Sequence, residues 1–382
     1  MSMAVTTQRK STQGFSNRSE LTGKARVMNS SKSNALSVLD CTLRDGGYYT
    51  NWTFSDALVA DYLTTMSALP VKAVELGYAG KGPEFGRFAR LTNSDICRFR
   101  PNSQIMLAVM LDAKDFFVPD EDLDDCLLQA LGPKTKDGID AVRVAANFGQ
   151  VHRCIKLIEK LRVQGYRVFL NLMKIDLATP SEIAQCLKAV EALSDIEAVY
   201  IADSLGSMCT DRVKDLCKLF SNCQIPALGF HAHDNCGIAI ANSISARAAG
   251  ATWLDSTVSG MGRGAGNART EQLIQAISEQ ECSLAAQDLL QRLIVRYFNP
   301  LQRQHGWGDN LFYQVGAGKG LHPTYVQEVL NDHSLSDTQA LFWIRTIPDN
   351  RPTFSRDILE EARKCAFYAE RLVTPEIVQV AQ

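Results

Sequence analysis

The sequence of 382 residues contains no apolar run near the roughly 20 residues that a membrane-spanning helix needs. It has almost no net charge, a formal −2 at pH 7, so its charge gives no reason to expect nucleic acid or an anionic membrane as a partner. Its eleven cysteines form no CxxC pair and no regular framework, which argues for reduced thiols rather than disulfides. These absences predict a soluble, cytoplasmic protein.

Residues 1–34 differ in composition from the rest of the chain. They are rich in Ser, Thr, Asn and Gln, carry six Lys and Arg against the single Glu20, and have no sustained apolar period. We expect a disordered extension. Organelle-targeting peptides share this acid-poor, Ser-rich composition, but the segment has no clear amphipathic stripe.

From Leu36 onward, short runs rich in Val, Ile, Leu and Ala alternate with segments of helical period. Apolar strands that alternate with helices indicate a parallel sheet buried on both faces. Eight such units are the number in a closed (β/α)₈ TIM barrel, although a doubly wound open sheet shares the alternation. The eight runs are 36–43, 71–78, 104–111, 139–145, 166–173, 196–202, 225–233 and 251–258.

Polar residues at the ends of these runs favour the barrel over the open sheet. In barrel enzymes the C-terminal ends of the strands converge on one mouth, where the active site lies. One polar strand end is explained by a helix cap, but a ring of them is not. We therefore predict an α/β protein with a TIM barrel over residues 35–284 and a mainly helical C-terminal region over 285–382. The ring is formed by Arg44, Asp45, Glu75, Asp112, Arg143, Asn171, Asp203, His231 and His233.

Two histidines separated by one residue, His231 and His233, end the seventh run. Alternate residues of a strand share a face, so the two imidazoles suit chelation of one metal ion. Asp45 follows the first strand, which only one strand separates from the seventh in a closed barrel. Two histidines and a carboxylate form a facial ligand set for a six-coordinate divalent metal, to which Asn267 could add a carbonyl oxygen. Taken alone, the His-Ala-His pattern also fits two ordinary histidines at a strand end.

This ligand set predicts a definite chemistry. A metal with open positions can bind a keto oxygen and an adjacent carboxylate, and as a Lewis acid it stabilises the enolate that forms when a neighbouring C–C bond is made or broken. Arg44, beside Asp45, supplies a second fixed positive charge at that oxygen. The alternative for Arg44 is a structural salt bridge at the barrel mouth.

Three separated motifs resemble the DRE-type metal-dependent TIM barrels, a family of aldolases, lyases and synthases. The motifs are Arg44-Asp45-Gly46, the segment 229–235 with its His-Ala-His, and the glycine-rich loop 259–267. The resemblance covers about residues 36–280 and is strongest to the 4-hydroxy-2-oxovalerate aldolase branch, through Tyr200-Ile201-Ala202-Asp203-Ser204.

The resemblance implies roles for individual residues. Asp45, His231 and His233 would bind Mn²⁺, or else Mg²⁺, Co²⁺ or Zn²⁺, with Asn267 as a further ligand. Ser204 would contact the carboxylate of pyruvate, and Arg44 and His231 would complete the substrate-binding set, with Arg44 stabilising the enolate.

One position departs from the family pattern. The aldolases carry a histidine base three residues after the motif aspartate, where this chain has Tyr48. An unperturbed tyrosine has a pKa of about 10 and is a poor base at neutral pH. A rough alignment places His322 where the aldolases have a C-terminal tyrosine near the substrate. We therefore predict that His322 takes or shuttles the proton and that Tyr48 hydrogen-bonds the substrate hydroxyl; the alternative for His322 is an ordinary surface-loop histidine.

The sequence is therefore interpreted as a metal-dependent aldolase, a carbon–carbon lyase that joins or separates a pyruvate enolate and an aldehyde. One alternative is a Claisen-type synthase or lyase that acts on an acyl-CoA at the same metal. The CoA lyases carry a cysteine in the loop after the eighth strand, whereas this loop reads Arg263-Gly264-Ala265-Gly266. The other is a non-catalytic barrel that serves as a binding subunit, which the retained ligand set disfavours.

The expected partners are small molecules, a 2-oxo acid and an aldehyde, with neither nucleic acid nor membrane, and the expected assembly is a homo-oligomer. Family aldolases use their C-terminal region to dock a dehydrogenase that consumes the aldehyde. The corresponding region here, including 307–313 and Phe342-Trp343, does not match, which argues against a dehydrogenase partner.

Overall fold

The computed structural model describes residues 36–82, 85–117, 122–193, 195–277 and 282–373. The disordered extension predicted over residues 1–34 lies outside these residues. The described part belongs to one compact unit that begins at Ala35.

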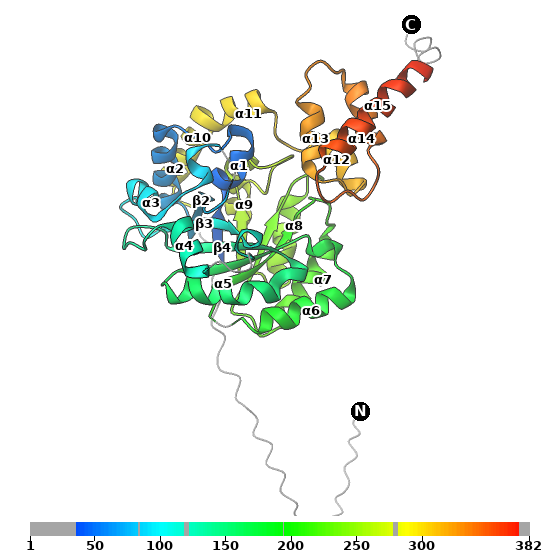
Figure 1. The fold of residues 1–382 in the computed structure, drawn as a ribbon. Helices are drawn as coiled ribbons and strands as arrows, with labels where there is room; N and C mark the ends of the chain where they lie inside the picture. The colour runs from blue at the N-terminus through cyan, green and yellow to red at the C-terminus, as the bar shows by residue number, and fades with distance from the viewer. Residues whose placement is uncertain (1–35, 83–84, 118–121, 194, 278–281, 374–382) are drawn as a thin grey trace, which may run out of the picture. The chain divides into compact units, whose positions relative to one another are not determined.

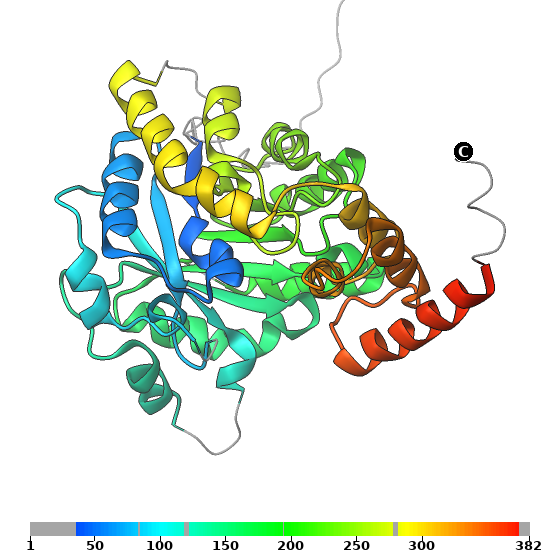
Figure 2. The ribbon, with the colours of Figure 1, turned by 90° about the horizontal axis from the view of Figure 1, so that it is seen from above.

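Eight parallel strands form a closed barrel in sequence order, which confirms the predicted (β/α)₈ TIM barrel (Figures 1 and 2). The barrel closes where β1 pairs with β8, with Leu39 opposite Asp255. Each strand lies within a few residues of a predicted apolar run. The strands are β1 Ser37–Asp40, β2 Ala73–Tyr78, β3 Met106–Asp112, β4 Ala141–Asn147, β5 Arg167–Met173, β6 Ala198–Asp203, β7 Leu228–Ala232 and β8 Trp253–Ser256.

The first strand is shorter than its apolar run predicts. β1 ends at Asp40, and the helix α1, Thr42–Thr50, begins almost at once. The Asp40 carboxylate accepts a hydrogen bond from the backbone N–H of Thr42 at 2.9 Å, which turns the chain out of the strand. Arg44 and Asp45 therefore lie in the first turns of a helix rather than at a strand end, and this helix carries Asp45 over the barrel mouth.

Helices alternate with the strands and then continue beyond the barrel as the predicted helical C-terminal region. The helices α12 to α15 gather on one side of the barrel (orange to red in Figures 1 and 2) and share a separate apolar core that includes Tyr325 and Trp343. The α-helices that follow α1 are α2 Asp56–Ala68, α3 Asn93–Phe99, α4 Leu123–Leu131, α5 Val151–Val163, α6 Pro180–Glu191, α7 Thr210–Ser221, α8 Ala239–Ala248, α9 Thr270–Ile277, α10 Leu284–Leu293, α11 Asn299–His305, α12 Leu311–Gly318, α13 Pro323–Leu330, α14 Asp337–Thr346 and α15 Arg356–Val373. A π-helical turn spans Ile294–Phe298.

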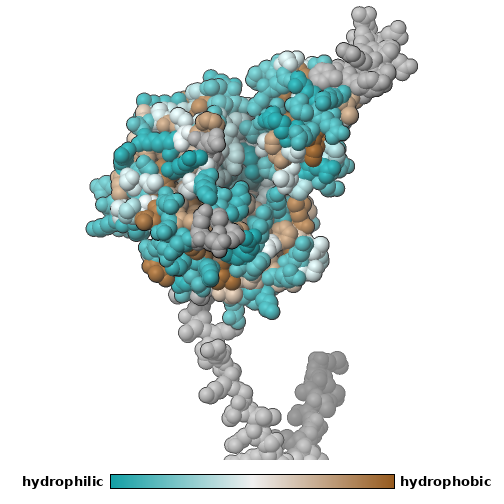
Figure 3. Space-filling view, viewed as in Figure 1, coloured by the Kyte–Doolittle hydropathy of each residue, from teal (hydrophilic) through white to brown (hydrophobic). Residues whose placement is uncertain are grey.

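The barrel interior has an apolar floor and a charged layer above it. Ala73, Ala141 and Trp253 belong to a buried apolar cluster inside the barrel. Two residues further along the same strands stand Glu75, Arg143 and Asp255, all buried. Since residues two apart share a face of a strand, these charges lie directly above the floor, toward the mouth. The visible outer surface is mostly hydrophilic (Figure 3), and no described helix is long and apolar enough to cross a bilayer.

Gly229 of β7 is a position where the packing of the interior tolerates no side chain. A Cβ atom at Gly229 would lie 2.6 Å from the ring of Tyr200, which is fully buried and stacks at 4.1 Å on the Arg143 guanidinium. We expect Gly229→Ala to lower the free energy of unfolding by about 1–3 kcal/mol, the usual cost of overpacking a core. Gly149→Ala, where no atom lies within 4 Å, is the matched control. Urea unfolding compares the two variants, and equal stability would contradict the close contact.

Candidate metal centre

The structure brings together the three residues that the sequence predicts as metal ligands. The side chains of Asp45, His231 and His233 are buried at the barrel mouth, and their ligand atoms all lie within 4.8 Å of one another. Asp45 Oδ2 is 3.3 Å from His231 Nε2 and 4.0 Å from His233 Nε2. Asp45 comes from α1 and His231 from β7, while His233 follows β7 in a bridge with Asn267.

Hydrogen bonds fix which nitrogen of each imidazole faces Asp45. His231 Nδ1 donates to the Asp255 carboxylate at 2.7 Å, and His233 Nδ1 donates to the carbonyl oxygen of Asp203 at 2.8 Å. In the neutral rings, both Nε2 atoms then present lone pairs toward the Asp45 carboxylate. A carboxylate and two lone pairs that converge in this way form a site for a cation.

The charges around these ligands keep the three groups in different protonation states. Burial tends to raise the pKa of Asp45, but Arg44 and the two imidazoles hold it well below its usual range. Burial, reinforced by His231, lowers the pKa of His233 to about 3. Burial also tends to lower the pKa of His231, yet the neighbouring carboxylates of Asp255 and Asp45 outweigh that effect and raise it. Asp45 is therefore ionised and His233 neutral, the forms in which they bind metal.

Three buried polar atoms at this point have no hydrogen-bond partner among the described residues: Asp45 Oδ2, His233 Nε2 and Asn267 Oδ1. Buried polar atoms are otherwise almost always satisfied, so this group of acceptors fits a divalent ion. The amide of Asn267 also donates to His231 Nε2 at 3.2 Å. A Cβ at Gly262 would lie 1.7 Å from Asn267 Oδ1, so only glycine lets the loop approach here. The glycine-rich loop thus serves close approach to the centre.

A chain of buried charges continues from the metal centre into the barrel. Arg44 Nη1 is 3.1 Å from Asp45, and Arg44 Nε donates to Glu75 at 2.7 Å. Arg143 Nη1 is 2.6 Å from Asp255, the partner of His231. Arg44 thus forms salt bridges at the barrel mouth, as expected if its role is structural. Its guanidinium also lies next to Asp45, where it could act on a bound substrate.

Ser204, Tyr48 and His322 border the same mouth. Ser204 Oγ accepts a hydrogen bond from the backbone of Lys174, and Tyr48 Oη lies 3.1 Å from Tyr78 Oη. His322 precedes α13, and its Nδ1 accepts from the backbone N–H of Thr324 at 3.3 Å. Burial, followed by the charges of Arg263 and Lys174, lowers its pKa to about 2. His322 is therefore a half-buried neighbour of the centre rather than a surface-loop histidine, and its neutral ring carries the proton on Nε2.

Sequence reasoning missed Asp255, which orients His231 from the strand between β1 and β7. A signal was present, because an aspartate interrupts the apolar run of β8, but it does not stand at the strand end. The sequence also gave no role to Lys174 or to the side chain of Arg263. Their nearness to the centre depends on loop conformations that no periodicity encodes.

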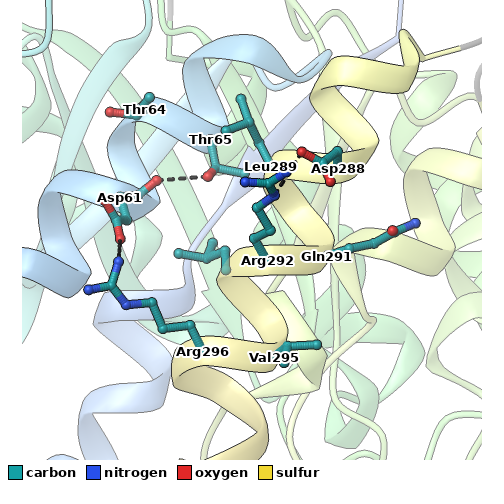
Figure 4. Close-up of a pocket in the computed structure, with 10 residues that line it drawn as sticks. Asp61, Thr64, Thr65, Asp288, Leu289, Gln291, Arg292, Val295 and Arg296 are labelled. Atoms are coloured by element: carbon teal, nitrogen blue, oxygen red, sulfur yellow. Dashed lines mark hydrogen bonds and ion pairs between the residues drawn. The ribbon is translucent and has the colours of Figure 1, made fainter.

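A groove between α2 and α10 lies apart from this centre (Figure 4). Its cations are paired: Arg296 Nη1 is 3.0 Å from Asp61, and Arg292 Nε is 2.8 Å from Asp288. Two groups of side chains in the described part of the chain could hold a metal, Asp45-His231-His233 and Cys41-His231-Asp255, and neither includes a residue of this groove. The chemistry is concentrated at the barrel mouth.

A closed (β/α)₈ barrel with a carboxylate and two histidines at its mouth defines a class of metal-binding barrel enzymes. The family model described as HMGL-like matches residues 35–294, so the chain belongs to the HMGL-like family. This membership confirms the predicted resemblance and an enzyme with lyase activity, and it argues against the non-catalytic barrel.

Curated relatives and solved structures agree with this assignment. A 4-hydroxy-2-oxovalerate aldolase of Spirochaeta aurantia is 32% identical over 65% of this chain and 72% of its own length. An oxaloacetate decarboxylase of Mycobacterium tuberculosis is 27% identical over 66% of this chain and 72% of its own length. The N-terminal domain of a candidate aldolase from Bacteroides vulgatus is 31% identical, with a TM-score of 0.68 over 80% of this chain and all of that domain. The carboxyl transferase domain of Rhizobium etli pyruvate carboxylase, 14% identical over 90% of this chain and 62% of that one, shares the fold with a TM-score of 0.58.

Replacing a ligand tests the metal centre directly. We expect His233→Ala to weaken Mn²⁺ binding by more than the roughly 10- to 100-fold that loss of an outer-shell partner typically costs. His152→Ala, on the exposed face of α5, is the matched control and should bind like the wild type. Titration of the metal-free protein with Mn²⁺, followed by electron paramagnetic resonance, gives the affinities. Wild-type affinity in His233→Ala would remove His233 from the ligand set.

Asp255 should act on the metal through His231. We expect Asp255→Asn to weaken Mn²⁺ binding by roughly 10- to 100-fold, because the neutral amide no longer holds His231 in the tautomer that presents Nε2. Asp211→Asn, an exposed residue of α7, is the control for loss of one negative charge. The same titration measures both variants, and circular dichroism verifies that each is folded. An unchanged affinity would show that His231 is oriented without Asp255.

Proposed function

We propose that the enzyme is a metal-dependent aldolase that joins a pyruvate enolate to an aldehyde, or separates the two, with Mn²⁺ as its metal. The observation that carries this proposal is the convergence of Asp45, His231 and His233 beside the buried guanidinium of Arg44. The relatives named 4-hydroxy-2-oxovalerate aldolase add support, because two of them match 63% and 65% of this chain. A divalent ion held by these residues and Asn267 would supply positive charge to the keto oxygen as the enolate forms.

The protein's own residues bind and orient the substrate. Ser204 offers its hydroxyl to the carboxylate of pyruvate, and Arg44 adds a fixed positive charge next to Asp45. His231 packs against the substrate while its Nδ1 stays bonded to Asp255. Because the bonds of Arg44 to Asp45 and Glu75 are already formed, its charge needs no reorganisation when the enolate appears.

In the forward direction, the methyl carbon of pyruvate gives a proton to Nδ1 of His322, and the resulting enolate carbon attacks the aldehyde carbon. A C–C bond forms, the aldehyde π bond breaks, and the new alkoxide takes up a proton. His322 directs Nε2–H to this oxygen, and Tyr48 hydrogen-bonds the hydroxyl that results. Full proton shuttling by His322 requires its Nδ1 to release the N–H of Thr324, so we propose that this bond opens during turnover.

Decarboxylation of a 2-oxo dicarboxylate is a second candidate reaction, because a relative is named oxaloacetate decarboxylase. It passes through the same enolate, which forms when a C–C bond breaks and carbon dioxide leaves. We also propose that the enzyme works in the cytoplasm, since its eleven cysteines form no CxxC pair and no regular framework. The homo-oligomer and the absence of a dehydrogenase partner stay predictions.

Exchange of the methyl protons of pyruvate in deuterium oxide, followed by proton NMR, tests the proposed function without an acceptor. We expect exchange in the Mn²⁺-loaded enzyme and its loss on chelation, because enolate formation needs the charge at the keto oxygen. Lack of exchange in the metal-loaded wild type would refute the pyruvate enolate as intermediate.

Replacing His322 tests its part in proton transfer. We expect His322→Ala to lower kcat of aldol cleavage by roughly 10²- to 10⁴-fold, the usual contribution of a positioned proton donor or acceptor, with unchanged Mn²⁺ content. His322→Asn keeps a side chain that can cap α13 but has no imidazole, so it should lose as much activity. His333→Ala, exposed after α13, is the control. Recovery of activity in His322→Asn would reduce the role of His322 to capping.

A further inference from the structure

Two basic residues, Arg263 and Lys174, contact Ser204 on the rim of the metal centre. Arg263, from the loop after β8, donates from Nη2 to the carbonyl oxygen of Ser204 at 3.2 Å. Lys174, after β5, donates its backbone N–H to Ser204 Oγ at 2.9 Å. Lys174 has a left-handed φ of 59°, which lysine rarely adopts, and this hydrogen bond helps to hold it there. The loops after β5 and β8 thus bring the backbone of Lys174 and the guanidinium of Arg263 to one residue.

Arg263 faces the metal ligands as well as Ser204. Its backbone N–H lies 3.5 Å from Asp45 Oδ1, and its guanidinium carbon is 5.6 Å from the centre of the Tyr48 ring. Its charge also contributes to the low pKa of both His233 and His322. The guanidinium therefore lies beside the space in which the aldehyde would meet the enolate.

Neither cation has an acidic partner within ion-pair distance in the described part of the chain. Among the described residues, Arg263 Nε is buried without a hydrogen-bond partner, and Lys174 Nζ donates only to the hydroxyl of Thr353 at 2.9 Å. Asp176 lies near enough to influence the pKa of Lys174 but forms no ion pair with it. The buried arginines Arg44 and Arg143, by contrast, are both paired with carboxylates. A partly buried, unpaired guanidinium is costly, so this position is complete only when an anion arrives.

We propose that Arg263 and Lys174 bind a second anionic group, a carboxylate on the aldehyde acceptor, so that the physiological acceptor is an aldehyde acid rather than a neutral aldehyde. The inference rests on the proposed function. It names the substrate class that the metal centre leaves open.

Charge matching assigns the pair to the acceptor rather than to pyruvate. Arg44 pairs with Glu75 and Arg143 with Asp255, so a divalent ion on Asp45 leaves one positive charge, which the carboxylate of pyruvate matches. The charges of Arg263 and Lys174 then remain for another anion. A carboxylate that leaves as neutral carbon dioxide would lose its attraction to them in the transition state, whereas an acceptor carboxylate keeps its charge throughout. The pair therefore favours aldol chemistry over decarboxylation.

Acceptor selectivity tests this inference. With pyruvate and Mn²⁺-loaded enzyme, kcat/KM is measured for glyoxylate and succinic semialdehyde against acetaldehyde and propionaldehyde. We expect the wild type to prefer at least one of the anionic aldehydes. We expect Arg263→Met to reduce the anionic-to-neutral ratio by about 10- to 100-fold, the range for a lost charge-assisted hydrogen bond, and Arg263→Lys to restore part of it.

Matched controls separate charge from loop structure. Lys174→Met removes the second cation, whereas Thr353→Val removes only the hydrogen bond of Lys174 and should keep the ratio. Lys218→Met removes an exposed cation at the C-terminal end of α7, away from the mouth. If Arg263→Met does not fold, Lys174→Met carries the test, and we expect the same fall in the ratio.

The outcomes distinguish failure of this inference from failure of the proposed aldolase function. Pyruvate deuterium exchange without a preference for anionic aldehydes would overturn the inference alone, as would an equal loss toward both acceptor types in Arg263→Met. Faster turnover of oxaloacetate than of any aldehyde, with the same dependence on Arg263, would assign the pair to a leaving carboxylate and also overturn it. No exchange at all in the wild type would overturn the proposed function and the inference with it.

Discussion

The geometry of the barrel mouth depends on one electrostatic constraint. A carboxylate oxygen and two imidazole nitrogens are held within 4.8 Å of one another, and the hydrogen bonds behind the rings direct lone pairs rather than protons toward the carboxylate. In a buried environment, acceptors of this kind repel one another unless a positive charge lies between them. Asp255 and the Asp203 carbonyl maintain the arrangement from behind, and the fold holds these two groups in strands.

Closure of the barrel makes this arrangement possible. Because β1 pairs with β8, Asp255 stands between the strand that leads to Asp45 and the strand that carries His231. The charged layer above the apolar floor then joins the centre to the opposite wall, through Arg143 on one side and Glu75 on the other. A buried network of this kind is stable only when each charge is paired, which ties the orientation of the ligands to the integrity of the barrel.

The barrel and the placement of His231 and His233 side by side could be predicted from the sequence because both follow from periodicity. Eight apolar runs set the strand count, and the two-residue repeat of a strand places His231 and His233 on one face. The expected position of Asp45 at a strand end was wrong in detail, because a side-chain bond from Asp40 to the backbone of Thr42 starts a helix early. Asp255 was accessible in principle, as a charge within an apolar strand. Lys174 and Arg263 were not, because a left-handed turn and a glycine-rich loop set their directions.

Contacts from α1 and from the C-terminal region restrain the loop after β8. Tyr49 Oη donates to the Gly264 carbonyl at 2.5 Å, and Trp307 Nε1 donates to the Ser259 carbonyl at 3.0 Å. Ala265 packs in the apolar cluster of α12 to α15. The same short loop carries Asn267 toward the metal ligands and Arg263 toward Ser204. The positions of Asn267 and Arg263 therefore both depend on the conformation of this loop. A change in the C-terminal region that shifts the loop would alter metal coordination and recognition of a second anion together.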